Sequence, residues 1–263
     1  MLTPEQIQAA SDLLWNAWQR GDTLDALPSE LRPVSRADGY AIQSLLERRS
    51  GEPLFGWKIA ATSSAGQTHI GVDGPIAGRL LAERAVDDNG ILPFGANHMN
   101  VVEAEFAFRM AHDLPPAAKP YTVEQVLAAV GTLHPAIEVP DSRYENFPKV
   151  GAPQLIADNA CAHQFVLGSA TPAAWRSLDL IEHAVVGTVE GKVRHEGKGA
   201  NVLGDPRVAL TWLANELSQL GVTLRAGQIV TTGTCLVPIP VSARDRVVAD
   251  FGVLGTVKLN FGP

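Results

Sequence analysis

The chain has 263 residues, of which 46% are hydrophobic and 19% are charged, and its formal net charge is −7. This composition is typical of a soluble globular protein, and the length is ample for a sizeable core. The acidic balance argues against a nucleic-acid partner, which would need a basic face. No apolar run approaches the roughly 20 residues that span a bilayer, so we expect no membrane partner either.

Two features of the sequence concern the cellular compartment. Residues 1–5 do not combine a basic region with a following apolar one, so they predict no signal peptide. The two cysteines, Cys161 and Cys235, make no disulfide framework and give no sign of an oxidising compartment. We therefore expect a cytoplasmic protein.

The chain begins with predicted helices and continues with predicted strands. Thr3 is a suitable N-cap for the first helix, Gly21 suits its end, and Ser35 caps a second helix. We expect residues 1–52 to form a helical annex and residues 53–263 to form a β-rich domain. Few helices separate the strands, which favours the α+β class over a doubly wound sheet.

A strand that carries two glutamates is the most informative stretch. Residues 101–108 are rich in β-branched and aromatic side chains and lack Gly and Pro. Side chains two apart on a strand share a face, so Glu103 and Glu105 project together. Close carboxylates repel each other and burial disfavours their charged forms, difficulties that a divalent cation resolves. The alternative is a solvated strand face with two ordinary surface glutamates.

A third glutamate occurs in a similar setting. Residues 136–139 form a short strand-like run that His134-Pro135 precedes, and Glu138 lies between apolar β-branched neighbours. Acidic residues inside apolar strands are not typical of a solvated charged face. We therefore expect Glu103, Glu105 and Glu138 to be metal ligands, and oxygen ligands of this kind suit Mg²⁺ or Mn²⁺.

Five short runs of the sequence, taken together, carry a family resemblance. They are Gly56-Trp57-Lys58-Ile59-Ala60, Glu103-Ala104-Glu105, Ala136-Ile137-Glu138-Val139, Ala157-Asp158-Asn159-Ala160 and Gly227-Gln228-Ile229-Val230-Thr231-Thr232-Gly233-Thr234. Their order and spacing resemble the 2-keto-4-pentenoate hydratase family, which belongs to the fumarylacetoacetate hydrolase superfamily and includes 4-oxalocrotonate decarboxylases. The resemblance implies a mixed β-roll with the N-terminal helices packed outside, a catalytic role for the β-rich domain, and a homo-oligomer.

The resemblance also implies an activity. It is a divalent-metal-dependent lyase that adds water to a 2-hydroxy-2,4-dienoate, giving a 4-hydroxy-2-keto acid in aromatic-compound catabolism. Lys58 lies among apolar residues, where a lysine is costly unless an anion meets it or its amine extends to solvent at a strand edge. In the family this lysine lies in the substrate pocket, so we expect Lys58 to receive the carboxylate of a 2-keto acid substrate or to transfer a proton.

Four further residues are candidates for the site. Asp158 and Asn159 follow an apolar run, where they suit hydrogen bonds to loops or to a metal-bound water; we expect Asp158 to be catalytic and Asn159 to bind substrate. Thr234 closes a run whose hydroxyls and amides suit an anionic ligand, so it is also expected to bind substrate. Cys161 is better interpreted as a buried small residue than as a nucleophile, and His163 is a candidate proton shuttle.

One position departs from the family pattern. Many hydratases carry an Asp directly after Pro75, and this chain has Ile76 there. A 4-oxalocrotonate-type 2-keto diacid decarboxylase, a C–C bond hydrolase acting on an acylpyruvate-like substrate, and a metal-stabilised accessory subunit without turnover therefore stay open. Residues 61–67 predict a mobile loop, with a lid as one role for it. Arg143 is expected to form an ordinary surface ion pair, the alternative being a pair with a carboxylate next to the metal ligands.

Overall fold

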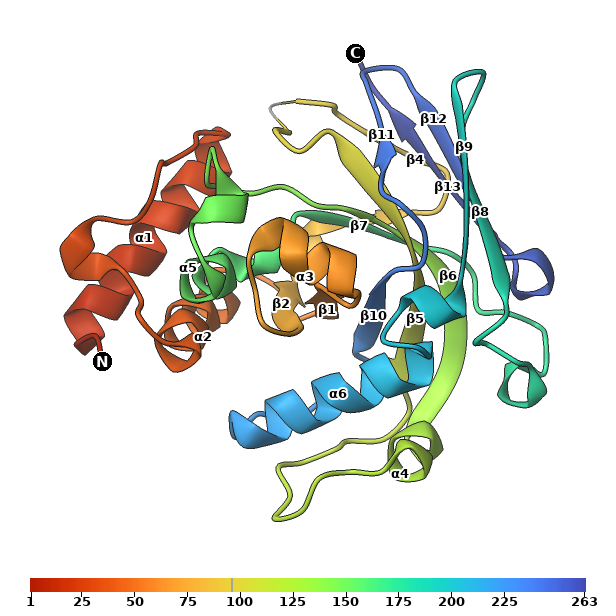
Figure 1. Ribbon diagram of the computed structural model, residues 1–263, viewed down its shortest axis with the longest axis horizontal. Helices are drawn as coiled ribbons and strands as arrows, with labels where there is room; N and C mark the ends of the chain where they lie inside the picture. Colours follow the sequence, from red (N-terminus) through yellow and green to blue (C-terminus); the bar gives the residue numbers. More distant parts are fainter. Residues whose placement is uncertain (96) are drawn as a thin grey trace.

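A computed structural model describes residues 1–95 and 97–263 and shows two β-sheets with helices grouped mainly at one end (Figure 1). The strands of the larger sheet are β1 (Gly56–Ala60), β2 (Ile76–Leu80), β3 (Ala85–Asp87), β5 (Val101–Met110), β6 (Val130–Val139), β7 (Gln164–Leu167), β10 (Ile229–Thr234) and β11 (Ile239–Pro240). Those of the smaller sheet are β4 (Gly90–Leu92), β8 (Ala184–Val189), β9 (Val193–Lys198), β12 (Arg246–Asp250) and β13 (Thr256–Phe261).

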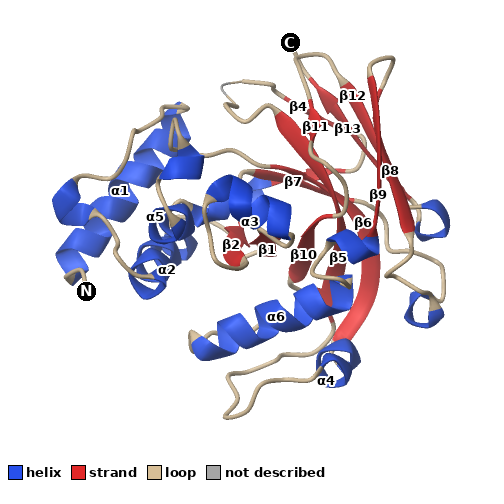
Figure 2. Ribbon diagram, in the orientation of Figure 1, coloured by secondary structure: helices blue, strands red, loops and turns tan. Residues whose placement is uncertain are grey.

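Both sheets mix parallel and antiparallel pairs. The larger sheet runs β2-β1-β10-β5-β6-β7-β3, with β11 beside β5, and the smaller runs β4-β13-β12-β8-β9. In the larger sheet β1 pairs with β10 in parallel, whereas β5 pairs with both β10 and β6 in antiparallel fashion. Figure 2 shows the second sheet standing against the long, curved strands β5 and β6. The α+β class expected from the sequence is confirmed.

Six α-helices among the described residues surround these sheets. They are α1 (Pro4–Arg20), α2 (Arg36–Ser44), α3 (Ser64–Ile70), α4 (Val123–Ala128), α5 (Ala152–Ala157) and α6 (Pro206–Gln219). The expected caps are present: Thr3 forms a capping box with Gln6, Gly21 ends α1 with φ 69°, and Ser35 caps α2. Trp18 on α1 packs against Leu46 and Leu81, which attaches the helical end to the body.

The alternation along β5 decides which face holds the core and which holds the site. Val102, Ala104, Phe106 and Phe108 are all buried, and the Phe106 ring makes an edge contact with Phe251 at 5.2 Å between ring centres. Phe251 follows β12, so this face packs against the smaller sheet. Glu103 and Glu105 therefore point to the opposite face, as the period of two requires.

Two local expectations were wrong. Residues 61–67 do not form an open loop, because Ser63 accepts a hydrogen bond from the Gly66 backbone N–H and caps the helix α3. The second glutamate strand does not begin after Pro135; β6 starts at Val130 and contains Pro135, immediately before the stretch that pairs with β7.

No helix among residues 1–95 and 97–263 has both the length and the apolar character that crossing a bilayer requires.

Candidate metal centre and active site

Strand register brings the three glutamates together. Glu103 on β5 pairs directly with Glu138 on β6, and Glu105 lies two residues along β5 on the same face. One carboxylate oxygen from each of the three residues lies within 4.8 Å of the others. Like charges directly opposite each other on neighbouring strands are destabilising, so this arrangement calls for a compensating cation.

Two of the three carboxylates are fully buried, and most of their oxygens lack hydrogen-bond partners among the described residues. Glu105 and Glu138 are both 0% exposed. Gly233 donates its backbone N–H to Glu105 Oε2 at 2.8 Å, whereas Glu105 Oε1 and both oxygens of Glu138 have no hydrogen-bond partner in the part of the chain that the structure describes. Buried oxygens without partners are costly, and carboxylate oxygens are the ligands that hard divalent cations prefer. The residues present therefore fit a divalent cation.

The glycine that orients Glu105 has no substitute. Gly233 has φ 91°, and a Cβ atom on it would lie 2.2 Å from the Thr62 hydroxyl oxygen. Sequence reasoning missed this residue, although a glycine inside the strand run Ile229–Thr234 is a signal for a bulge or a close backbone approach. The pairing of β10 with β5 indeed shifts register between Thr231 and Thr234.

Lys58 lies beside the cluster and not at a solvated strand edge. Its side chain is 3% exposed, its Nζ lies 2.9 Å from Glu138 Oε1, and it donates a hydrogen bond to the Ala160 carbonyl oxygen at 2.9 Å. The contact with Glu138 is an ion pair without the alignment of a hydrogen bond. Three carboxylates and one ammonium leave two negative charges when all are ionised, which one divalent cation balances.

Burial and charge shift the proton affinities of these groups. Burial, reinforced by Glu138, raises the pKa of Glu103 to about 7. Burial and the two neighbouring carboxylates raise the pKa of Glu105 well above its ordinary value. Burial works to lower the pKa of Lys58, but the charges of Glu138 and Glu103 oppose it and raise that pKa overall. Lys58 is therefore an ammonium at neutral pH.

A cavity of about 760 Å³ opens onto this cluster. Lys58 and Glu103 line it, whereas Glu105 and Glu138 are fully buried beside Glu103 and are not among the lining residues described. Thr234 also lines the cavity and donates its hydroxyl to the Leu236 carbonyl at 2.7 Å. Apolar side chains supply much of the remaining wall, and they include Ile70, Ile76, Met99, Phe147, Leu236 and Val237. A site of this kind holds a small anionic group at one end and an apolar group at the other.

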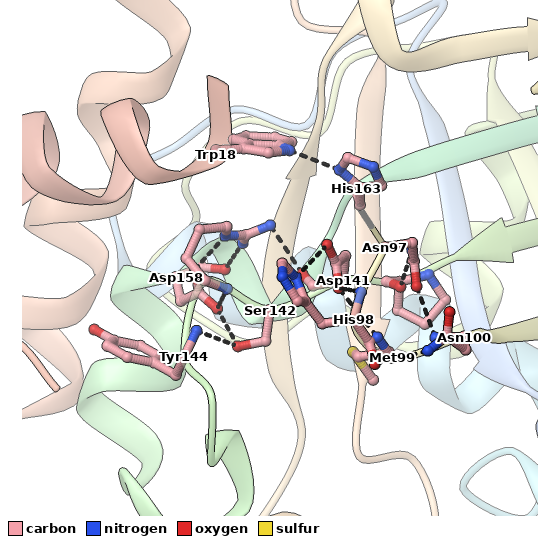
Figure 3. Close-up of polar contacts among 12 residues, drawn as sticks. Trp18, Asn97, His98, Met99, Asn100, Asp141, Ser142, Tyr144, Asp158 and His163 are labelled. Atoms are coloured by element: carbon pink, nitrogen blue, oxygen red, sulfur yellow. Dashed lines mark hydrogen bonds and ion pairs between the residues drawn. The ribbon is translucent and has the colours of Figure 1, made fainter. Parts of the chain in front are cut away.

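One wall of the cavity is held by an aspartate. Asp141 Oδ1 accepts hydrogen bonds from the backbone N–H groups of His98 at 2.8 Å and Met99 at 3.2 Å, and Figure 3 shows these residues gathered around it. The imidazole Nδ1 of His98 lies 3.4 Å from Asp141 Oδ2. His98 and Met99 both line the cavity, so Asp141 fixes the position of two lining residues.

The structure does not bring Asp158 and Asn159 to the cavity. Asp158 is 1% exposed and forms an ion pair with Arg143, while Ser142 donates its hydroxyl to Asp158 Oδ2 at 2.7 Å. Asn159 uses its side chain on the backbone of Arg79 in β2. Contact of Asp158 or Asn159 with substrate is therefore not supported. The expectation of a surface ion pair for Arg143 was wrong, because Arg143 is 3% exposed.

The two remaining candidates behave as structural groups. Burial, reinforced by the charge of Asp158, raises the pKa of the Cys161 thiol to about 12, so the thiol stays neutral although it lines the cavity. Burial and the charge of Arg143 lower the pKa of His163 to about 3, and Trp18 Nε1 donates to His163 Nδ1 at 2.6 Å. His163 is not among the residues described as lining the cavity, which does not favour a proton shuttle.

The chain belongs to the fumarylacetoacetate (FAA) hydrolase C-terminal family, which its residues 69–261 match. It is 33% identical over 263 residues to the 2-keto-4-pentenoate hydratase of Paraburkholderia xenovorans, covering 99% of this chain and 96% of that protein. It is 37% identical over 225 residues to the enzyme of the same name from Burkholderia vietnamiensis, covering 84% of each.

A second group of relatives carries a different name. The chain is 32% identical over 263 residues to the 4-oxalocrotonate decarboxylase of Pseudomonas sp. CF600, covering 99% of this chain and 98% of that protein. A solved 4-oxalocrotonate decarboxylase from Pseudomonas putida G7, complexed with magnesium and adipate, superposes with a TM-score of 0.89 at 30% identity over 99% of both chains. The family resemblance and the mixed β-roll expected from the sequence are confirmed.

Proposed function

We propose that the protein is a divalent-metal-dependent hydro-lyase. It adds water to a 2-hydroxy-2,4-dienoate and releases a 4-hydroxy-2-keto acid, as in aromatic-compound catabolism. The observation that carries this proposal is the convergence of Glu103, Glu105 and Glu138, with free oxygens, beside a buried lysine at the end of a cavity. Relatives named 2-keto-4-pentenoate hydratase at 33–37% identity support it.

The three glutamates are the proposed ligands of the cation, with Mg²⁺ first and Mn²⁺ as an alternative. The magnesium in the related decarboxylase structure supports a divalent ion of this kind. A bound cation would chelate the substrate's carboxylate and 2-oxygen and stabilise the charge that develops there. Lys58 would donate to the same oxygens and hold or deliver a proton, and Thr234, which lines the same cavity, would bind the anionic end.

Metal binding should depend on pH with a defined sign. The pKa of Glu103 is raised to about 7 in the folded metal-free protein, so its contribution to stability is present at low pH and is lost as pH rises through about 7. Mg²⁺ must displace that proton and the proton of Glu105, whose pKa is also raised, so its affinity should fall at least about tenfold per pH unit below 7. At a fixed subsaturating Mg²⁺ concentration, the rise in Tm over an EDTA control should be several degrees larger at pH 8 than at pH 6. A rise that is equal at both pH values would contradict a site made of these carboxylates.

A specific observation favours the decarboxylase as a second candidate. Ile76 is 1% exposed and lines the cavity where many hydratases carry an Asp, so no carboxylate is available there to guide water. Loss of CO₂ from a vinylogous 2-keto diacid needs no such group, and it develops charge on the same 2-oxygen. The C–C bond hydrolase is less favoured, because the relatives named above at 32–37% identity are hydratases and a decarboxylase.

The cavity favours a neutral apolar tail on the substrate. Besides Lys58, the basic side chains among its described lining residues are the imidazoles of His69 and His98, and His98 lies against Asp141. A second carboxylate would meet no fixed cation there, whereas each buried methylene gains about 0.8 kcal/mol, or roughly a factor of 4.

A substrate comparison tests both the reaction and the tail. With Mg²⁺ present, kcat/KM should rise roughly fourfold per added carbon across 2-hydroxy-2,4-dienoates with longer alkyl tails. Products are identified by mass and by proton NMR, which separates water addition from CO₂ loss. If a 2-keto diacid loses CO₂ faster than any dienoate gains water, the protein is a decarboxylase and the hydratase proposal is wrong.

We further propose that residues 1–52 act as an annex to the catalytic part, residues 53–263, that the chain assembles as a homo-oligomer, and that it works in the cytoplasm. The family assignment and the attachment of α1 through Trp18 support the first two proposals. The small-molecule chemistry of the named relatives supports the third.

A further inference from the structure

Three consecutive residues next to the site have left-handed backbone conformations. Asn159, Ala160 and Cys161 have φ values of 55°, 51° and 60°. Asparagine tolerates this region, but alanine and cysteine do so poorly, and a run of three is disfavoured for L-residues. Such a turn persists only where its surroundings impose it, and an observed run of this kind is a reason to look for a function.

One side of the turn is fixed to the sheet. Asn159 Oδ1 accepts a hydrogen bond from the Arg79 backbone N–H at 2.6 Å, and Asn159 Nδ2 donates to the Arg79 carbonyl at 2.8 Å. These two bonds join the turn to β2 in the manner of an extra strand. The neighbouring Gly78 permits the approach, because a Cβ there would lie 2.4 Å from the Asn159 carbonyl oxygen and 3.1 Å from Lys58 Cγ.

The other side of the turn is held by a buried ion pair. Arg143 pairs with the carboxylate of Asp158, the residue before the turn, and its backbone N–H also donates to Asp158 Oδ2 at 3.1 Å. The same guanidinium donates from Nη1 to the Ala162 carbonyl at 3.1 Å, just after the turn. The Trp18 ring covers this guanidinium, whose central carbon lies 4.7 Å from the ring centre. Figure 3 shows Trp18 pointing to His163 above Asp158.

This arrangement fixes the position of one carbonyl group, that of Ala160. Ala160 C=O accepts the hydrogen bond from Lys58 Nζ at 2.9 Å, and Ala160 also lines the cavity. The carboxylate of Glu138 lies 2.9 Å from the same Nζ, but neither of its oxygens has a hydrogen-bond partner among the described residues, and this carboxylate belongs to the proposed cation site. A lysine whose carboxylate partner serves a metal needs a second, fixed partner to stay in place.

We propose that Asn159, together with the Asp158–Arg143 pair, positions Lys58 through the left-handed turn at 159–161. These residues do not touch the substrate; they set the place of the Ala160 carbonyl, which in turn aims the Lys58 ammonium at the cavity. The inference rests on the proposed function, in which Lys58 meets the anionic end of a 2-keto acid.

The test is a double-mutant cycle between Asn159→Ala and Lys58→Met. Pyruvate binding in the presence and absence of saturating Mg²⁺ serves as the first readout, because it does not depend on which reaction follows. Asn159→Ala should weaken Mg²⁺-dependent pyruvate binding about tenfold, in line with loss of aligned hydrogen bonds, and leave Mg²⁺ affinity within about twofold. In the Lys58→Met background, Asn159→Ala should have no further effect. On turnover, kcat/KM should show the same non-additivity.

Matched variants keep the result interpretable. Asn159→Gly removes the same two hydrogen bonds but tolerates the positive φ of this position, so it replaces Asn159→Ala if that variant does not fold. Tyr144→Phe removes a buried hydroxyl that has no partner among the described residues, and it should bind pyruvate as the unaltered protein does.

The possible failures are distinguishable. Equal losses from Asn159→Ala in both backgrounds, or no loss at all, would overturn the positioning role while leaving the proposed function intact. Pyruvate binding that is indifferent to Mg²⁺ in the unaltered protein would overturn the proposed function and this inference with it.

Discussion

Replacing Glu105 by Gln is expected to remove Mg²⁺ binding and turnover together. The change keeps the size of the side chain but removes one of three carboxylates that face the same point. Loss of several kcal/mol of charge stabilisation at the reacting oxygen corresponds to a fall in kcat/KM on the order of 10³-fold. Isothermal titration with Mg²⁺ and steady-state kinetics on the same preparation measure the two effects.

The metal-free Glu105→Gln protein gives a second, independent reading. Glu105 is fully buried among like charges, and its pKa is raised well above the ordinary value by burial first and by Glu138 and Glu103 next. Removing that carboxylate should therefore leave the Tm in EDTA unchanged or higher above pH 7, where the cluster must ionise. A residue needed only for the fold would show the opposite.

A strand glutamate elsewhere serves as the control for this substitution. Glu196 on β9 has a side chain that is 68% exposed and pairs with Arg194 at the surface. Glu196→Gln should change neither Mg²⁺ affinity nor kcat/KM, because exposed ion pairs contribute little. If Glu105→Gln kept full activity, Glu105 would not be a metal ligand.

The sequence predicted those features that depend on a few neighbouring residues. The capping box of Thr3 and Gln6 is a local pattern, and so is the alternation that puts Glu103 and Glu105 on one face. The place of Glu138 is different, because it depends on which residue of β6 pairs with Glu103. Apolar strands do not specify that register locally, so the sequence could group Glu138 with the other two only through its similar setting inside an apolar run.

The structure departs from the sequence expectations where long-range contacts decide the conformation. Asp158 and Asn159 looked like site residues, since polar groups after an apolar run often are, but their side chains hold a turn in place. Nothing in Asn159-Ala160-Cys161 predicts three left-handed residues, because two of them disfavour that region in isolation. The sequence also suggested a surface position for Arg143. Its burial depends on the buried partner Asp158, and only the packed fold determines that contact.

Lys58 is the residue whose replacement best separates a catalytic site from a structural metal site. Lys58→Met keeps the length of the aliphatic chain and removes the charge beside Glu138. If Lys58 donates to the substrate carboxylate in a desolvated pocket, losing that bond costs about 2–4 kcal/mol, and kcat/KM should fall roughly 30- to 1000-fold.

Mg²⁺ affinity in the same variant should not fall. Lys58 is an ammonium at neutral pH, and its positive charge repels a cation bound to the three carboxylates, so its loss should leave Mg²⁺ affinity equal or higher. In EDTA the variant should be less stable, because the carboxylates lose their internal counter-ion, and Mg²⁺ should restore the Tm.

Lys198→Met, which removes an exposed lysine paired with Glu182, is the matched control and should keep full turnover. Metal titration and kinetics on Lys58→Met therefore decide the matter together: bound metal with lost turnover assigns Lys58 to the chemistry, whereas undiminished turnover leaves it as a counter-ion of the glutamates.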